Sequence, residues 1–162
     1  MKLSHLDAAG RARMVDVGDK PITVRTATAE GAIRMSREAF GLVAAGAVAK
    51  GDVLAVSEMA GTLAAKRTAE LIPLCHPLGL DHVEVAATLD ESLPGIRIRA
   101  VTKAVGRTGV EMEAMTATSV ALLTVYDMVK AADRTMEILG VHLVEKTGGT
   151  RGDWRRESGP DA

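Results

Sequence analysis

Apolar residues fill almost every turn of residues 108–134, which read TGVEMEAMTATSVALLTVYDMVKAADR. Thr108 is followed three residues later by Glu111, the pattern of a capping box, so we expect a helix to begin here. A helix that is apolar nearly all round is a buried helix. At roughly 25 residues it would be ~37 Å long, because each residue adds ~1.5 Å. The pattern therefore predicts a central helix around which the rest of the chain packs.

Ionisable residues interrupt this helix only near its two ends. Asp127 and Lys130 are three residues apart and share one face. Two interpretations stay open: an ordinary surface ion pair, or a functional site, since an ion pair among apolar neighbours carries a desolvation cost. Glu113 lies on nearly the same face of the helix as Asp127, but the two are ~21 Å apart along the helix axis. Either the chain carries two sites, or one site is built from two chains.

The remaining pattern predicts a strand at residues 22–33 and a short helix at residues 37–45, capped by Ser36. A second helix is expected from its cap, Asp52, to about Glu70. Alternating residues then predict an antiparallel hairpin at residues 81–89 and 96–105 and a last strand at 136–146. A short strand at 13–17 is a further expectation.

This order of elements predicts an α+β fold: a ferredoxin-like βαββαβ sandwich with an additional helix and an antiparallel sheet. Residues 1–162 would form a single catalytic domain, with residues 1–20 and 147–162 flexible. Helices would cover one face of the sheet and leave the other open. Because 47% of the residues are hydrophobic, we expect the open face to contact another subunit.

Composition excludes several classes of protein. Only Phe40, Tyr126 and Trp154 are aromatic, too few for a surface that stacks on nucleic-acid bases. Cys75 is the only cysteine, so the chain has no internal disulfide and no multi-cysteine metal site. No apolar run approaches a membrane span, and the N-terminus lacks the apolar core of a signal peptide. We therefore expect a cytoplasmic protein with no membrane or nucleic-acid partner and no metal site.

The segment LIPLCHPL, residues 71–78, presents a thiol and an imidazole on a stiff backbone, because Pro73 and Pro77 hold it extended. A nucleophilic pair of Cys75 and His76 is one interpretation. Adjacent residues of an extended chain point to opposite sides, however. The geometry favours a structural cysteine beside a functional histidine.

Basic residues gather around the few candidate acid and base groups. Several cations near a few such groups suit a small polyanionic substrate. The basic set is Arg25, Lys50, Lys66, Arg67, Lys130 and Lys146. At a helix end, Lys66 or Arg67 also has an ordinary role beside the helix dipole. The glycine-rich stretch KTGGTRGD, residues 146–153, is not a Walker A loop; it is either a lid over an anion or a frayed tail.

Six stretches closely resemble the cyclic pyranopterin monophosphate synthase family, the second enzymes of molybdenum cofactor biosynthesis. They are MVDV (14–17), KGDV (50–53), AAKRTAELIPLCHPL (64–78), TGVEMEAMTA (108–117), YDMVKA (126–131) and KTGGTRGDW (146–154). The resemblance covers essentially the whole chain. LIPLCHPL together with GVEMEA and YDMVKA is highly specific.

The resemblance implies a lyase that converts (8S)-3′,8-cyclo-7,8-dihydroguanosine 5′-triphosphate to cyclic pyranopterin monophosphate and diphosphate. It implies no required cofactor, with Mg²⁺ on the triphosphate or diphosphate as an option. It also implies a homo-oligomer, a hexamer built as a trimer of dimers, with active sites at subunit interfaces.

The same resemblance implies roles for individual residues. Asp127, Lys130 and Lys50 would be catalytic. The substrate-binding residues would be Leu74, Cys75, His76, Met112, Glu113, Arg25, Lys66 and Lys146. Two alternatives stay open from the residues alone: a non-catalytic module that binds a nucleotide, and a hydrolase that depends on Cys75.

Overall fold

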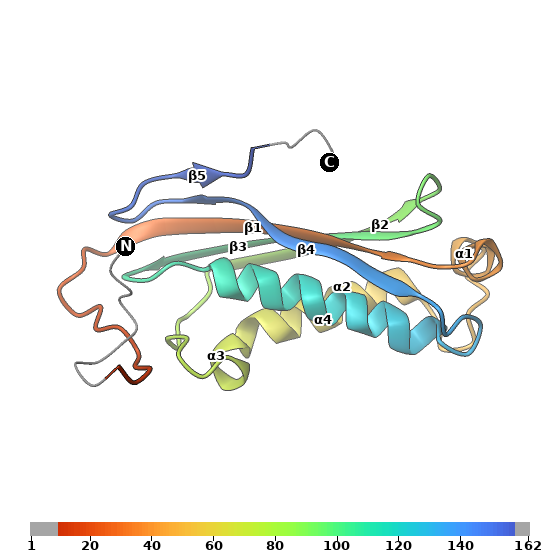
Figure 1. The fold of residues 1–162 in the computed structure, drawn as a ribbon, viewed down its shortest axis with the longest axis horizontal. Helices are drawn as coiled ribbons and strands as arrows, with labels where there is room; N and C mark the ends of the chain where they lie inside the picture. The colour runs from red at the N-terminus through yellow and green to blue at the C-terminus, as the bar shows by residue number, and fades with distance from the viewer. Residues whose placement is uncertain (1–9, 158–162) are drawn as a thin grey trace.

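The computed structural model describes residues 10–157, which form one antiparallel five-stranded sheet with helices packed against it (Figure 1). The strands lie in the order β2-β3-β1-β4-β5. In chain order the elements are β1 (Thr23–Arg34), α1 (Arg37–Ala44), α2 (Val53–Lys66), α3 (Thr68–Leu71), β2 (His82–Asp90), β3 (Gly95–Gly106), α4 (Glu111–Val129), β4 (Glu137–Thr147) and β5 (Trp154–Arg155).

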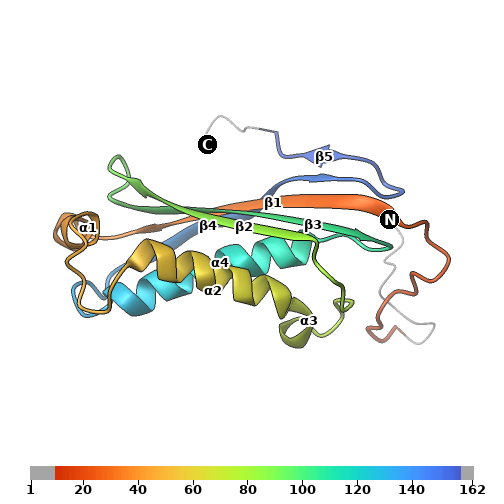
Figure 2. The same cartoon turned by 180° about the vertical axis from the view of Figure 1, so that it is seen from behind.

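The strand pairing confirms the predicted α+β class and the ferredoxin-like arrangement. The central strand β1 pairs antiparallel with β3 on one side and β4 on the other, and β2 pairs with the outer side of β3. Helices α2 and α4 lie side by side on one face of this sheet (Figure 2). The two-residue strand β5 extends the sheet beyond β4 and was not predicted.

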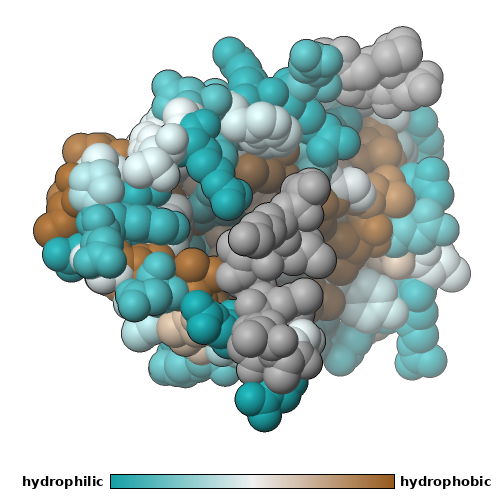
Figure 3. Space-filling view, turned by 60° about the vertical axis from the view of Figure 1, so that its left-hand side comes forward, coloured by the Kyte–Doolittle hydropathy of each residue, from teal (hydrophilic) through white to brown (hydrophobic). Residues whose placement is uncertain are grey.

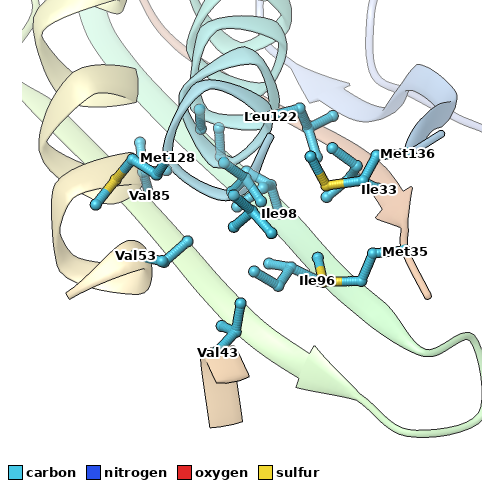
Figure 4. Packing of buried hydrophobic residues seen from close by; sticks show 14 of the residues in the cluster. Ile33, Met35, Val43, Val53, Val85, Ile96, Ile98, Leu122, Met128 and Met136 are labelled. Atoms are coloured by element: carbon cyan, nitrogen blue, oxygen red, sulfur yellow. The ribbon is translucent and has the colours of Figure 1, made fainter. Parts of the chain in front are cut away.

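Helix α4 is the central helix that the sequence predicts, and close approaches fix it in place. A Cβ atom on Gly61 of α2 would lie 2.9 Å from the carbonyl oxygen of Ala117 on α4. A Cβ atom on Gly31 of β1 would lie 2.9 Å from the side chain of Leu122. Only glycine permits such contacts. The apolar core between α4 and the sheet includes the fully buried Ile33 and Ile98 (Figure 4).

The predicted ends of this helix are wrong. The capping box does not form: α4 begins at Glu111, and no side chain caps it. The Glu111 carboxylate instead pairs with Lys146 of β4, at 3.3 Å. The helix also ends at Val129 rather than near residue 134. Beyond it, the carboxylate of Asp133 accepts backbone hydrogen bonds from Ser36 and Thr135, both at 2.7 Å, which hold this segment in a turn.

The other predicted elements lie within a few residues of their observed positions. Ser36 and Asp52 cap α1 and α2 as expected, accepting hydrogen bonds from the backbone of the residue three further along. The second helix stops at Lys66, because Thr68 bonds its hydroxyl to the carbonyls of Ala64 and Ala65, and residues 68–71 form the separate turn α3. The strand expected at residues 13–17 is absent, and that segment is irregular.

The open face of the sheet carries ion pairs between charged side chains. Arg99 contacts Glu30, and Arg97 contacts Asp90 at 2.5 Å. Exposed apolar side chains lie on this face too, where Val24 of β1 and Val105 of β3 pair. Others lie on the helices: Met59, Leu63 and Leu123 are 65%, 53% and 57% exposed. The contact of the open face with another subunit stays a prediction. No helix within residues 10–157 has the length and apolar character to cross a membrane.

Candidate active site

A cavity of about 290 Å³ lies at the end of the sheet where α4 begins. The β3–α4 loop, the β4–β5 turn, the 71–78 segment and the N-terminal segment form its walls. Six candidate residues line it: Arg25, Leu74, Cys75, His76, Met112 and Lys146. We call it the basic cavity, because its described lining contains several cations and a single acid, Glu111. Figure 3 turns this end of the molecule forward and shows hydrophilic side chains mixed with apolar ones.

Arg25 is the most deeply placed cation of the basic cavity. Its side chain lies under the β3–α4 loop, where Nε donates to the carbonyl of Gly106 and Nη2 to that of Arg107, both at 3.1 Å. The residue is only 8% exposed. Within residues 10–157 no carboxylate pairs with it. A buried cation without a carboxylate is well suited to receive an anionic ligand.

Cys75 and His76 point to different partners, as expected for neighbours in an extended segment. The His76 ring bonds through Nε2 to the carbonyl oxygen of Val15, at 2.7 Å. The Cys75 thiol donates to Glu113 Oε1, at 3.6 Å. Burial, with the charge of Glu113 adding to it, raises the pKa of Cys75 to about 11. The thiol is therefore protonated at neutral pH, which disfavours a Cys–His nucleophile.

Glu113 lies behind the cavity wall and is 3% exposed. One of its oxygens accepts the Cys75 thiol, and the other has no hydrogen-bond partner in the described part of the chain. Burial raises the pKa of this carboxyl group. Its environment therefore favours the protonated form, which can hold and donate a proton.

Asp127, Lys50 and Lys130 meet at the other end of α4, and we call them the acid–lysine cluster. Lys130 Nζ donates to Asp127 Oδ1 and Lys50 Nζ donates to Oδ2, each at 2.7 Å. These hydrogen bonds from Lys130 and Lys50 lower the pKa of Asp127 to about 2. All three side chains are about half exposed, so the apolar surroundings expected for this pair are absent within one chain.

The acid–lysine cluster also has a simpler role at the end of the helix. Lys50 Nζ donates to the backbone carbonyl of Asp127, at 2.8 Å. The last carbonyls of a helix lack partners within it, and cations stabilise that end. This contact alone explains a lysine at position 50. It does not explain why two ammonium groups hold the carboxylate of Asp127 and leave the group half exposed.

The candidate residues therefore fall into two separate groups. Glu113 stands with the basic cavity, and Asp127 stands in the acid–lysine cluster 14 residues later, which is ~21 Å along a helix. Lys66 belongs to neither group: it is exposed at the end of α2 and does not line the basic cavity. The catalytic and binding roles themselves stay predictions.

The structure adds residues to the basic cavity that the sequence analysis did not single out. They are Lys20, Arg107 and Arg151, together with Gly149 of the β4–β5 turn. The sequence held one signal for Arg151: it lies in the glycine-rich stretch at residues 146–153, and a lid over an anion is one of the two interpretations of that stretch. It held none for Lys20 and Arg107, which look like ordinary loop cations. Across residues 10–157, no cluster of three or more His, Cys, Asp or Glu side chains is placed to hold a metal ion.

Comparison with known proteins identifies the family of this chain. Residues 14–149 match the model of the MoaC family, a range that contains every candidate site residue. A cyclic pyranopterin monophosphate synthase of Brucella ovis is 57% identical over 153 residues, 94% of this chain and 93% of its own length. One from Chloroflexus aggregans is 56% identical over 156 residues, 96% of this chain and 94% of its own length. The chain belongs to the MoaC family.

Proposed function

We propose that this protein is a cyclic pyranopterin monophosphate synthase of molybdenum cofactor biosynthesis. It converts (8S)-3′,8-cyclo-7,8-dihydroguanosine 5′-triphosphate to cyclic pyranopterin monophosphate and releases diphosphate. The observation that carries this proposal is the near full-length identity of 56–57% to curated relatives with that name. The geometry of the basic cavity supports it independently, because the cavity suits a compact polyanion.

The phosphate chemistry calls for cations near the α-phosphorus and the departing diphosphate. A hydroxyl of the sugar attacks the α-phosphorus, a new P–O bond closes the cyclic phosphate, and the bond to the diphosphate breaks. Arg25 and Lys146 in the basic cavity would neutralise the negative charge of the phosphates as it shifts to the leaving group. Any Mg²⁺ would arrive with these phosphates, and the proposal needs no other cofactor.

The rearrangement of the base calls for proton transfers. The five-membered ring of the purine must open and the pterin ring must close, so protons are removed from some atoms and added to others. Leu74, His76 and Met112 would hold the base end of the substrate. Asp127 and Lys130 would move protons, with Lys50 holding the carboxylate in place.

One complete site needs both the basic cavity and the acid–lysine cluster, and these lie at opposite ends of α4. Two protomers packed about a two-fold axis, with their α4 helices antiparallel, bring the acid–lysine cluster of each chain to the basic cavity of the other. The exposed Met59, Leu63 and Leu123 support a contact through the helices. The proposal is a cytoplasmic homo-oligomer, a hexamer built as a trimer of dimers.

Turnover of the cyclised triphosphate tests this function directly. The purified protein is incubated with (8S)-3′,8-cyclo-7,8-dihydroguanosine 5′-triphosphate, and diphosphate and the pterin chromophore are measured together. We expect one diphosphate for each pterin. Binding of the nucleotide without diphosphate release would instead favour the non-catalytic module. Activity that disappears on alkylation of Cys75, with no pterin formed, would favour the hydrolase.

A further inference from the structure

Arg25 joins two backbone segments that are far apart in the sequence. Its guanidinium donates to the carbonyls of Gly106 and Arg107, in the β3–α4 loop. On its other side it packs against the β4–β5 turn: a Cβ atom on Gly149 would lie 2.1 Å from Arg25 Nη1. Gly149 also has a positive φ of 83°, so the turn depends on glycine there for two reasons. The buried guanidinium thus forms the floor between the two segments.

Each of these two segments carries a further arginine that lines the basic cavity. Arg107 follows directly on the carbonyl of Gly106, and Arg151 lies two residues beyond Gly149. Both are exposed, in contrast to Arg25. The turn that carries Arg151 is held by the Asp153 carboxylate, which accepts the backbone N–H of Gly148 at 2.8 Å. Arg107 is tied down through Nε, which donates to the carbonyl of Lys20 at 3.2 Å.

The charge of the cavity is largely uncompensated. Five cations line it, and one of them, Lys146, is paired with Glu111. The other four, Lys20, Arg25, Arg107 and Arg151, have no carboxylate partner within residues 10–157. Four unpaired cations around about 290 Å³ repel each other and attract a multiply charged anion. A chain of phosphates offers more oxygens and more negative charge to these separate cations than a single phosphate does.

We propose that Arg107 and Arg151 are two further substrate-contacting residues, which grip the polyphosphate of the substrate from the two sides of the Arg25 floor. Planar guanidinium groups bind phosphate oxygens with paired hydrogen bonds, which suits this role. The two arginines thereby select ligands with two or three phosphates over those with one. The identity of the ligand as a nucleoside triphosphate rests on the proposed function; the grip on a phosphate chain does not.

The test measures binding of inorganic phosphate chains to the full-length protein. Calorimetry compares tripolyphosphate, diphosphate and monophosphate on the wild type, on Arg107→Ala, on Arg151→Ala and on the double variant. Arg37→Ala is the matched control, because Arg37 is an exposed arginine of α1 outside the cavity. We expect each cavity variant to weaken tripolyphosphate binding about tenfold, as for the loss of a charged hydrogen bond. Monophosphate binding should change less than twofold.

Kinetics with the cyclised triphosphate give a second readout. In the double variant, KM should rise by about the product of the two single increases. Its kcat should stay within about threefold of the wild-type value, because the arginines bind the phosphates in substrate and transition state alike. Arg107→Lys and Arg151→Lys should recover part of the loss. Circular dichroism must show the same thermal midpoint as the wild type, which separates lost contacts from lost folding.

The outcomes separate this inference from the proposed function. An unchanged tripolyphosphate affinity in the double variant, or an equal loss in Arg37→Ala, overturns the phosphate grip. Turnover with an unchanged KM in the double variant also overturns it, while the proposed function stands. If the wild type binds tripolyphosphate through the two arginines but does not convert the cyclised triphosphate, the grip stands and the proposed function falls.

Discussion

The thiol of Cys75 donates to the carboxyl group of Glu113, at 3.6 Å, and joins the 71–78 segment to the first turn of α4. Both groups are partly or fully withdrawn from water, and burial raises the pKa of each. A neutral thiol beside a carboxyl group that favours its neutral form is a hydrogen-bonded pair, not a nucleophile with its base. This contact lets the cavity wall hold two polar groups without an isolated charge.

The reactivity of Cys75 should report this contact. Because its pKa is about 11, alkylation by iodoacetamide should be slow at neutral pH and still rising at about pH 10. Glu113→Gln removes the nearby carboxylate and should therefore lower the pKa and speed alkylation. Mass spectrometry of the alkylated fraction against pH measures both. A rate that levels off below pH 9, the ordinary pKa of the thiol, would contradict the contact.

Cys75→Ser should keep substantial activity, within about tenfold of the wild type, because serine can still donate to Glu113 and no covalent step is needed. The rates of diphosphate release under saturating substrate compare the two proteins. If Cys75→Ser were as inactive as a variant of Asp127, covalent chemistry at the thiol would become the leading interpretation.

Asp127→Asn should lower turnover by roughly 10²- to 10⁴-fold, a usual scale for the loss of an acid–base group. Stability should hardly change, since exposed ion pairs contribute little. Single-turnover rates and a thermal melt measure the two effects. Glu137→Gln is the matched control, because Glu137 is also an exposed carboxylate paired with a cation, Arg34, but belongs to neither group of candidate residues. Activity of Asp127→Asn within twofold of the control would remove Asp127 from the mechanism.

The stability of the fold should depend on pH through Glu113. Burial raises the pKa of Glu113 above its ordinary value of 4.5, so the folded state holds this proton more tightly than the unfolded state does. The stabilising effect is complete below that ordinary value and is lost as pH rises through the folded pKa. Glu113→Gln abolishes it. The free energy of unfolding is measured with urea at pH 5 and pH 8 for both proteins. The difference, variant minus wild type, should be more positive at pH 8 than at pH 5. An equal difference at both pH values would show that Glu113 is ionised throughout.

The two-chain site predicts complementation between inactive variants. When Glu113→Gln and Asp127→Asn proteins exchange subunits, each mixed dimer has one site with both wild-type groups and one with neither. Random exchange makes half of all dimers mixed, so up to about a quarter of wild-type activity should return. Mass spectrometry confirms the exchange. Activity that stays at the level of the single variants would place a complete site within each chain.

The sequence predicted what depends on local pattern. The strands, the caps Ser36 and Asp52 and the central helix follow from periodicity and short-range hydrogen bonds. The separation of Glu113 from Asp127 follows from their spacing on that helix. The true start of α4 did not follow, because Glu111 prefers a partner on β4, Lys146, which is 35 residues away in the sequence.

The missed part of the candidate site has the same physical origin. Arg107 is an unremarkable loop cation, and nothing near it in the sequence indicates a ligand. Arg151 lies in the glycine-rich stretch at residues 146–153, whose sequence leaves an anion lid and a frayed tail equally open. The two arginines become neighbours of one cavity only because β1 lies between β3 and β4 and carries Arg25 to the point where both loops meet. A local sequence pattern cannot predict which strands pair when they are distant in the chain.

The close contacts of Gly31 and Gly61 fix the position of α4 against the sheet and α2. The length of α4 therefore sets the distance between the basic cavity and the acid–lysine cluster. One residue inserted between Ala117 and Asp127 would turn the acid–lysine cluster by about 100° and shift it by about 1.5 Å relative to the basic cavity. In a two-fold assembly the error would appear in both sites at once. Insertions in the β2–β3 loop leave this spacing untouched. In the proposed two-chain site, the number of residues in α4 therefore matters as much as the identity of any side chain on it.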